Sequence, residues 1–374
     1  MYKKQIDGYR AILFLAVFTY HHSVGAWALT YALPAFFTLS GFLISRILVA
    51  GDGLPRLTFL KSFYARRFLR VVPAFYGFIT IAACFGLLSY PLWQFAYAYN
   101  IKLYLLSLDT SSGDFLDLFA RWQHGQLHLW SLAIEEQFYL LFPILVVFTR
   151  PKARPWIILA LIAGSIALRM HFASDPRLAG TVYGALLPIC GEYIMWGALL
   201  GVLEVQRFRF GPPSLYLHGG ILGFLLMCRI DDPSVYKGFF QFIPNPRQTL
   251  YALPIAAVTI GLWLDDRSLI ATFLRFPLLT WFGKMSYGLY LVHMITWDLQ
   301  AWLARHFEWC AAIPAYFLRF FLCTAAATLS WHFYELPLNN LKRHFPVPDP
   351  STRSLPTTSG RGDGEKTGEA ATPR

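Results

Sequence analysis

Apolar stretches recur along the chain between residues 10 and 333, and most have the length of a helix that crosses a bilayer. About 20 apolar residues are needed to span a hydrocarbon core of roughly 30 Å. The pattern predicts helices at residues 10–30, 33–50, 72–92, 129–149, 155–172, 184–204, 214–230, 249–265, 277–297 and 311–333. The expected fold is an all-α integral membrane protein, a polytopic bundle of about ten transmembrane helices.

The turns between these helices differ in charge. An even number of helices returns both termini to one side, and the turns on that side carry Arg46, Arg56, Lys61, Arg66, Arg67, Arg70, Arg150, Lys152, Arg154, Arg207, Arg209, Arg267, Arg275, Lys342 and Arg343. The opposite turns are poorer in basic residues and carry Asp109, Asp114, Asp117, Asp231 and Asp232. Because cytoplasmic loops hold an excess of Lys and Arg, both termini are predicted to be cytoplasmic.

Two segments differ from the helical pattern. Residues 91–128 are too long for a turn and too mixed for a clear span, so they are interpreted as an extracytoplasmic or partly re-entrant segment. Residues 346–374 are rich in Pro, Ser, Thr and Gly and lack an apolar face. We therefore expect one membrane domain at 1–345 and a disordered cytoplasmic tail at 346–374.

Composition supports a membrane location. Of the 374 residues, 56% are hydrophobic, 17% aromatic and only 14% charged, which is too apolar for a soluble domain. The net charge of +11 lies in the turns, so it fits a membrane better than a nucleic-acid partner. The five cysteines are far apart, without the spacing of a disulfide framework or a zinc site. The expected location is the cell membrane, which the chain crosses several times; in a Gram-negative bacterium this would be the inner membrane.

The first helix carries ionisable residues that a membrane span usually excludes. Arg10 and His21 are eleven residues apart, which returns to within about 20° of the same face and rises about 16 Å. Asp7 shares this face if the helix begins early enough, whereas His22 points about 100° away. His21 is either a functional group or a histidine satisfied by a neighbouring backbone carbonyl.

The segment "FYARRFLRVVP" contains Arg66, Arg67 and Arg70. Arg67 and Arg70 are three residues apart and are therefore neighbours on a helix. Such a pair can hold a phosphate group by charge-assisted hydrogen bonds. The competing interpretation is a basic turn that meets anionic lipid headgroups.

Glu135 and Glu136 lie about two turns into the apolar segment "HLWSLAIEEQFYLLFP". Paired carboxylates there are unfavourable unless they meet a cation, a hydroxyl or a polar cavity. The alternatives are a functional site and a structural salt bridge between helices.

Other polar residues give weaker signals. His124 and His128 are four apart and could ligate a metal on a helix, but no third ligand is spaced with them, so a structural role is favoured. Packing and interhelical hydrogen bonds explain most of the others, which are Ser40, Gly41, Ser286, Tyr287, Tyr290, His293 and Glu335.

Several of these motifs occur in an order that resembles acyltransferase family 3, the polytopic membrane O-acyltransferases of bacterial surface and secreted sugars. The shared motifs are "IDGYRAILFLAVFTYHH", "FFTLSGFLIS", "RRFLRVVP", "HLWSLAIEEQFYLLFP" and "SYGLYLVH", and the resemblance extends to about Phe345. The family's Glu-Arg-Pro near the last helix is here Glu335, Leu336 and Pro337, so no ligand role is assigned there.

The resemblance implies an acyl-coenzyme A donor, with acetyl-coenzyme A expected, on the cytoplasmic side and a carbohydrate or glycolipid acceptor opposite. Arg10, Arg67 and Arg70 are expected to bind the donor phosphates, and His21 and Glu135 to be catalytic. His21 would deprotonate the acceptor hydroxyl or carry the acyl group itself, and Glu135 would orient His21 or bind the acceptor. Supporting residues are expected at Asp7, Ser40, Trp130, Ser131, Glu136, Tyr139, Tyr287 and His293. No metal and no permanently bound cofactor is expected.

Two other classes remain to be weighed. Intramembrane His and Glu also serve proton relays, so a proton-coupled transporter is one alternative. The other is an inactive relative that acts as a scaffold for a glycan-assembly complex.

Overall fold

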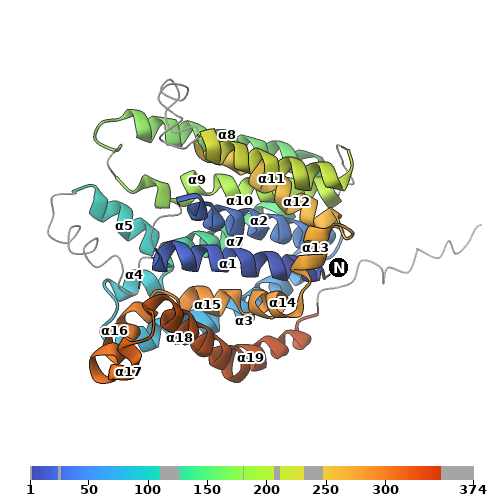
Figure 1. Cartoon of the computed structure of the whole chain (residues 1–374). Coiled ribbons are helices and arrows are strands. Elements are labelled where there is room, and N and C mark those ends of the chain that lie inside the picture. Colours follow the sequence, from blue (N-terminus) through green and yellow to red (C-terminus); the bar gives the residue numbers. More distant parts are fainter. Residues whose placement is uncertain are drawn as a thin grey trace, which may run out of the picture.

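The computed structural model describes residues 2–23, 27–109, 126, 128–179, 181–205, 211–230 and 247–346, and every regular element in these ranges is a helix (Figure 1). The expected tail lies outside this part of the chain from residue 347 onwards. Seven other residues named above also lie outside the described part of the chain, namely Asp114, Asp117, His124, Arg207, Arg209, Asp231 and Asp232.

Four helices form the centre of the bundle. α1 (Lys4–His22) packs against α2 (Ala32–Ala50), which follows the short 3₁₀ helix η1 (Trp27–Tyr31). α2 in turn packs on α7 (Leu129–Phe148) and, over its most extensive interface, on α10 (Glu192–Val205).

Further helices cover the two sides of this centre (Figure 1). On one side α10 contacts α8 (Arg154–Ser174) and α12 (Arg247–Leu264), and α12 packs on α11 (Pro213–Ile230). On the other side, α3 (Arg56–Cys84) and α18 (Ala315–Ser330) both contact α15 (Ser286–Val292). The remaining short elements are α4 (Pro91–Phe95), α5 (Tyr99–Ser107), η2 (Pro151–Ala153), η3 (Tyr183–Ala185), α9 (Leu187–Cys190), α13 (Leu269–Leu274), α14 (Pro277–Lys284), α16 (Thr296–His306), α17 (Glu308–Ala311), η4 (Trp331–Glu335), α19 (Leu336–Asn340) and η5 (Leu341–His344).

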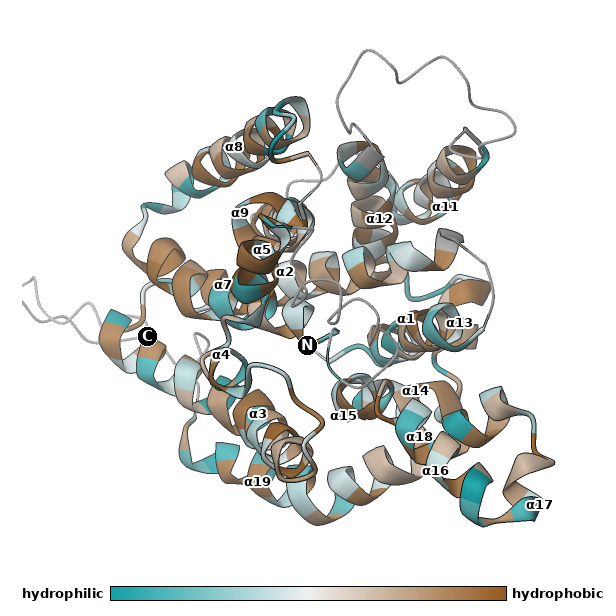
Figure 2. Ribbon diagram, turned by 90° about the vertical axis from the view of Figure 1, so that its left-hand side faces the viewer, coloured by the Kyte–Doolittle hydropathy of each residue, from teal (hydrophilic) through white to brown (hydrophobic). Residues whose placement is uncertain are grey.

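Several helices expose large apolar side chains. Leu140 and Leu141 of α7, Leu225 of α11, and Phe317 and Phe321 of α18 are all more than half exposed. Figure 2 shows hydrophobic residues along α3 and α7. Apolar surface of this extent on a folded chain indicates contact with lipid.

Four helices of the described chain are long and apolar enough to cross a membrane, namely Leu29–Ala50, Arg56–Cys84, Leu129–Phe148 and Pro151–Ser174. The first helix is not among them; it contains Asp7, Arg10 and two histidines, which make it less apolar than these four. Membrane character and an all-helical fold are thus supported. The count of ten spans and the cytoplasmic placement of both termini stay predictions.

Several helix boundaries differ from those expected. The first helix runs from Lys4 to His22 instead of 10–30, and α3 runs from Arg56 to Cys84 instead of 72–92. Both helices begin earlier than an apolar window suggests because their N-terminal halves contain charged residues, of which Arg10, Arg67 and Arg70 line a cavity within the bundle. The helix expected at 277–297 is divided at Met285 into α14 and α15.

Glycines allow the central helices to touch backbone to backbone. A Cβ atom on Gly41 of α2 would lie 1.9 Å from the carbonyl oxygen of Ile194 on α10, and one on Gly197 would lie 1.9 Å from that of Thr38. Gly8 of α1 would approach the Leu274 oxygen to 1.8 Å in the same way. Since no side chain fits these spaces, the packing of α2 on α10 depends on glycine.

We expect Gly41→Ala to destabilise the protein by about 1–3 kcal/mol, because the added methyl group forces two backbones apart. The matched control is Gly164→Ala in α8, where a Cβ atom meets nothing within 4 Å. The control is expected to leave stability unchanged or to raise it by about 0.5–1 kcal/mol. Thermal unfolding in detergent measures both, and an equal melting temperature for the two variants would contradict the packing argument.

Candidate functional site

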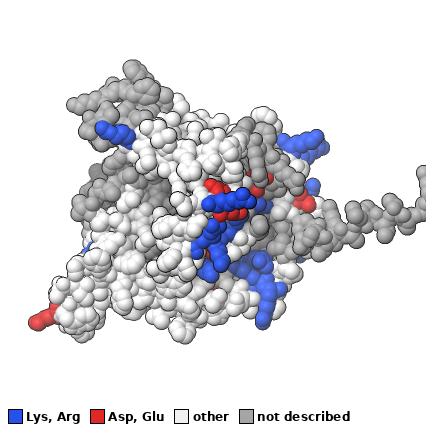
Figure 3. Space-filling model, turned by 45° about the vertical axis from the view of Figure 1, so that its right-hand side comes forward, with Lys and Arg blue, Asp and Glu red and all other residues white. Residues whose placement is uncertain are grey.

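A cavity of about 980 Å³ lies inside the bundle, lined from α1, α2, α3, α7, α10, α12, α14, α15 and the segment 331–342. It begins near the N-terminus, where Lys3 and Lys342 line it, and reaches Ser131 and Tyr290 at its inner end. Seven cationic side chains and four carboxylates line it, so its charge favours an anionic ligand. Figure 3 shows Lys and Arg side chains gathered around Asp and Glu on this side of the molecule.

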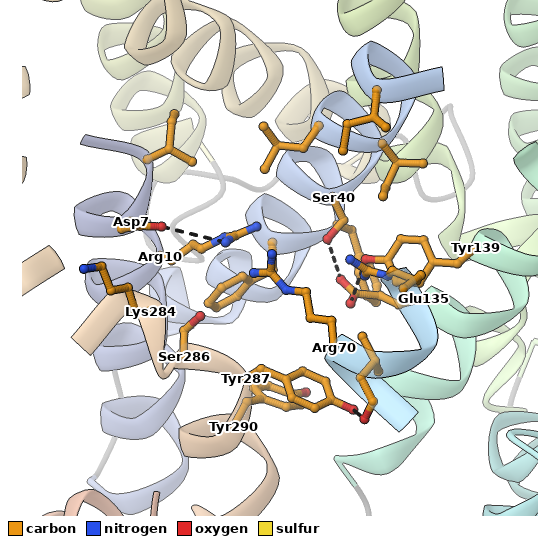
Figure 4. A pocket seen from close by; sticks show the side chains of 18 of the residues that line it. Asp7, Arg10, Ser40, Arg70, Glu135, Tyr139, Lys284, Ser286, Tyr287 and Tyr290 are labelled. Atoms are coloured by element: carbon orange, nitrogen blue, oxygen red, sulfur yellow. Dashed lines mark hydrogen bonds and ion pairs between the residues drawn. The ribbon is translucent and has the colours of Figure 1, made fainter. Parts of the chain in front are cut away.

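Two arginines extend toward each other across this cavity (Figure 4). Arg10 comes from α1 and lies 3.9 Å from a carboxylate oxygen of Asp7, which also accepts a hydrogen bond from the Tyr2 hydroxyl. Arg70 comes from α3 and lines the same space. The structure therefore brings together Asp7, Arg10 and Arg70, as the sequence predicted.

Arg66 and Arg67, the adjacent arginines of α3, have different environments. The Arg67 guanidinium lies 3.5 Å above the Tyr139 ring, and its Nε atom is buried without a hydrogen-bond partner. Arg66 instead donates to the backbone carbonyls of Lys342 and Phe345. Arg67 and Arg70 both line the cavity because residues three apart lie on the same side of a helix. Arg66 instead holds residues 342–345 against α3 through its two hydrogen bonds.

Glu135 lies at the side of the cavity formed by α7. It accepts hydrogen bonds from the Ser40 hydroxyl at 2.9 Å and from the Tyr139 hydroxyl at 3.1 Å, as Figure 4 shows. Glu136 does not line the cavity, in agreement with its predicted position about 100° round the helix. Trp130 also lies outside the lining and packs edge-on against Phe37.

The inner end of the cavity is formed by hydroxyl groups. The Ser131 and Tyr290 hydroxyls are 2.6 Å apart, and Ser131 also donates to the His128 carbonyl. Tyr287 lines the cavity and donates to the Val71 carbonyl at 3.3 Å. α15 directs both tyrosines inward because it begins directly after the break at Met285.

His21 does not line the cavity but belongs to a histidine cluster beyond it, which comprises His21, His22, His128 and His293. The His293 ring centre lies 5.3 Å from that of His21, 6.1 Å from that of His22 and 4.7 Å from that of His128. His293 is fully buried, and its Nδ1 atom lies 2.6 Å from the Tyr290 carbonyl oxygen. The cluster thus begins where the cavity ends.

Sequence reasoning missed part of this arrangement. His22 was expected to point away from the site and His128 to be structural, yet both join the cluster. The chain brings His128 and His293 together from positions 165 residues apart, a proximity that no local spacing reveals. Within the described ranges, no group of three or more His, Cys, Asp or Glu side chains is arranged to hold a metal ion.

The outer end of the cavity holds Lys342, which donates a hydrogen bond to Asn339. Burial, together with the positive charges of Arg70, Arg66 and Arg67, lowers the pKa of Lys342 to about 7. Its charge therefore changes near neutral pH, and a bound anion would favour the protonated form.

The fold and the cavity define an all-helical protein of membrane character with a largely cationic cavity inside the bundle. The chain belongs to acyltransferase family 3, because the family model described as "Acyltransferase domain" matches residues 3–332.

Among curated proteins, the chain is 26% identical over 368 residues to "O-acetyltransferase OatA" of Staphylococcus aureus, covering 90% of this chain and 57% of that protein. It is 28% identical over 326 residues to "Peptidoglycan O-acetyltransferase OatA" of Listeria monocytogenes, covering 78% of this chain and 49% of that protein. The chain thus spans about half the length of these relatives. No solved structure matches significantly.

We expect Lys342→Met to stabilise the protein at about pH 6, where the folded state must bury a protonated lysine. As pH rises through the folded pKa of about 7, the wild-type lysine loses its charge on folding and regains stability, so the difference shrinks by about pH 9. Melting temperatures measured at both pH values test this, with Arg343→Met, an exposed neighbour, as the control. If the difference in melting temperature between Lys342→Met and the wild type did not change with pH, the lowered pKa of Lys342 would be contradicted.

Proposed function

We propose that this protein transfers an acetyl group from an acyl-coenzyme A to a hydroxyl of a cell-surface carbohydrate. Family membership establishes the acyltransferase class, and both relatives described above are named as O-acetyltransferases. The observation that carries the proposal is the cationic cavity, which runs from the basic end of the bundle to the histidine cluster. It offers a route for an anionic donor toward the imidazole of His21.

The donor fits this cavity by charge and size. Coenzyme A carries several phosphate charges, which the guanidinium groups of Arg10 and Arg70 can bind through charge-assisted hydrogen bonds. Arg67, held over Tyr139, adds a third cation with an unused Nε donor. The volume of about 980 Å³ is at the upper end for small-molecule sites, which suits a long, extended donor.

In this proposal His21 removes the proton from the acceptor hydroxyl as that oxygen attacks the thioester carbonyl carbon. The carbon–sulfur bond then breaks, and the departing thiolate takes the proton. The Ser131 and Tyr290 pair lies between the cavity and the histidine cluster, so these side chains must move to let the thioester pass. A two-step route through an acyl-histidine uses the same geometry.

We assign Glu135 to the donor cavity, where the Ser40 and Tyr139 hydroxyls hold its two oxygens. It thereby fixes the Tyr139 ring on which Arg67 rests. A hydrogen bond donated by His21 to Glu135 is the less favoured arrangement, because both carboxylate oxygens already accept hydrogen bonds and His21 does not line the cavity. The remaining expectations, a multi-pass location in the cell membrane and cytoplasmic termini, belong to the same proposal.

The transporter and scaffold alternatives are not favoured, because the chain belongs to an acyltransferase family. They also predict different chemistry. A transporter moves its substrate without consuming a thioester, and a scaffold retains its role after loss of His21.

We expect His21→Ala to lower kcat for thiol release from acetyl-coenzyme A by about 10²- to 10⁴-fold, the usual contribution of a general base. The double variant Arg67→Ala, Arg70→Ala is expected to raise the donor KM by about 10- to 100-fold, because charged hydrogen bonds to phosphate are lost. Purified protein in nanodiscs, supplied with radiolabelled acetyl-coenzyme A and a panel of sugars, provides the measurement.

The control is Arg56→Ala, which removes an exposed arginine that begins α3 outside the cavity. It should leave the donor KM unchanged. Turnover that survives loss of His21 would place the chemistry elsewhere, and an equal effect of Arg56→Ala would mean that the cavity arginines have no special role.

A further inference from the structure

The cations that line the cavity differ in whether a carboxylate neutralises them. Arg46 pairs with Glu204 at 2.5 Å, whereas no carboxylate in the described ranges forms an ion pair with Lys342. Glu335, the lining carboxylate nearest to Lys342 along the chain, accepts a hydrogen bond from Ser330 instead. The wall of the cavity therefore carries an uncompensated positive charge at Lys342.

Lys342 is held at the outer end of the cavity through both its backbone and its side chain. Its carbonyl oxygen accepts a hydrogen bond from Nη1 of Arg66 at 3.2 Å, which fixes η5 against α3. Its ammonium group donates to Oδ1 of Asn339, which also lines the cavity. An ammonium group has three N–H donors, so two of them remain for an anion.

The charged groups around Lys342 are all basic. η5 packs on α3 and on α19, and α19 contributes no charged side chain. The charged or titratable side chains that face Lys342 from α3, or lie beside it on η5, are Arg66, Arg67, Arg70, Arg343 and His344. Burial, together with the positive charges of Arg70, Arg66 and Arg67, lowers the pKa of Lys342 to about 7. A ligand with two negative charges would offset this repulsion and favour the protonated lysine.

The proposed function determines which end of the donor meets Lys342. The thioester must reach the inner end of the cavity, where Ser131 and Tyr290 separate it from His21. Coenzyme A is a long molecule with its thiol at one end and its nucleotide at the other, so the nucleotide lies at the outer end. That nucleotide carries a phosphate monoester on its ribose. At neutral pH such a group has a charge of about −2 and three acceptor oxygens.

We propose that Lys342, together with Arg70, recognises the ribose phosphate of the coenzyme A donor and that Lys342 takes up a proton when this phosphate binds. The inference rests on the proposed function and adds a specificity residue to the same cavity. A thioester of phosphopantetheine on a carrier protein lacks the ribose phosphate, so it would be a poorer donor. A lipid phosphate is the other source of the same chemistry, and the test separates the two.

The test compares coenzyme A with dephospho-coenzyme A, which lacks only the ribose phosphate. At about pH 7, wild-type protein in phosphatidylcholine nanodiscs should bind coenzyme A about 10- to 100-fold more tightly, the usual effect of a charged hydrogen-bonded pair. Lys342→Met should lose most of this preference, and Lys342→Arg should keep it. The control is Arg343→Met, which removes the exposed neighbouring cation and should also keep the preference.

The pH dependence distinguishes a phosphate ligand from a residue that only supports the fold. The phosphate monoester loses its last proton near pH 6, so its charge is almost constant above about pH 7. As pH rises from about 7 to about 9, the lysine of the free protein becomes neutral and must bind a proton together with the phosphate. The preference of the wild type should therefore fall about 10-fold over this range, whereas that of Lys342→Arg should stay constant. Calorimetry near pH 8 in buffers of different ionisation enthalpy should show uptake of about one proton by the wild type and none by Lys342→Arg.

Equal affinity of the wild type for the two ligands would overturn the inference and leave the proposed function intact, because a donor would still bind. The inference also fails if Lys342→Met keeps the preference or if Arg343→Met loses it equally. It fails as well if phosphatidylglycerol added to the nanodiscs displaces coenzyme A from the wild type and Lys342→Met alters only the affinity for this lipid. Binding of neither ligand would contradict the inference and the proposed function together. Acetyl transfer is measured separately, and phosphate-selective binding without any transfer would support the site and count against the proposed function.

Discussion

The organisation of this protein depends on how it keeps charged groups inside a membrane domain. An isolated charge in such a setting is strongly unfavourable, so each one needs a partner or a polar space. Two arginines are neutralised by ion pairs: Arg169 pairs with the fully buried Glu192, and Arg154 binds both carboxylate oxygens of Asp52. Around the cavity, cations outnumber carboxylates, and that remaining positive charge is what the proposed donor would neutralise.

Close helix packing holds these groups in position. α2 and α10 approach until the backbones touch at Gly41 and Gly197, and α1 touches α14 where Gly283 meets the Asp7 carbonyl. Asp7 lies beside Arg10 at this contact, so the geometry of the cavity wall depends directly on the glycine. In a bilayer, where apolar contact between helices adds little over contact with lipid, such close approach is a main source of specificity.

The cationic cavity and the histidine cluster are neighbouring but separate. Tyr290 belongs to both, since its hydroxyl meets Ser131 at the cavity end and its ring lies 5.1 Å from that of His293. In the proposed function, this separation would let a donor and an acceptor reach the chemistry from different sides without an open pore between them.

The sequence by itself determined the membrane class, the positions of most apolar helices and the pairing of Arg67 with Arg70, because hydrophobic length and helical spacing are local properties. Five motifs in order also indicated the family, which the match over residues 3–332 confirmed. Tertiary structure alone decided that Arg66 leaves the cavity, that α14 and α15 are separate helices, and that His22, His128 and His293 meet. It also decided that His21 lies beyond the cavity wall. These outcomes depend on contacts between residues far apart in the chain, which no local periodicity specifies.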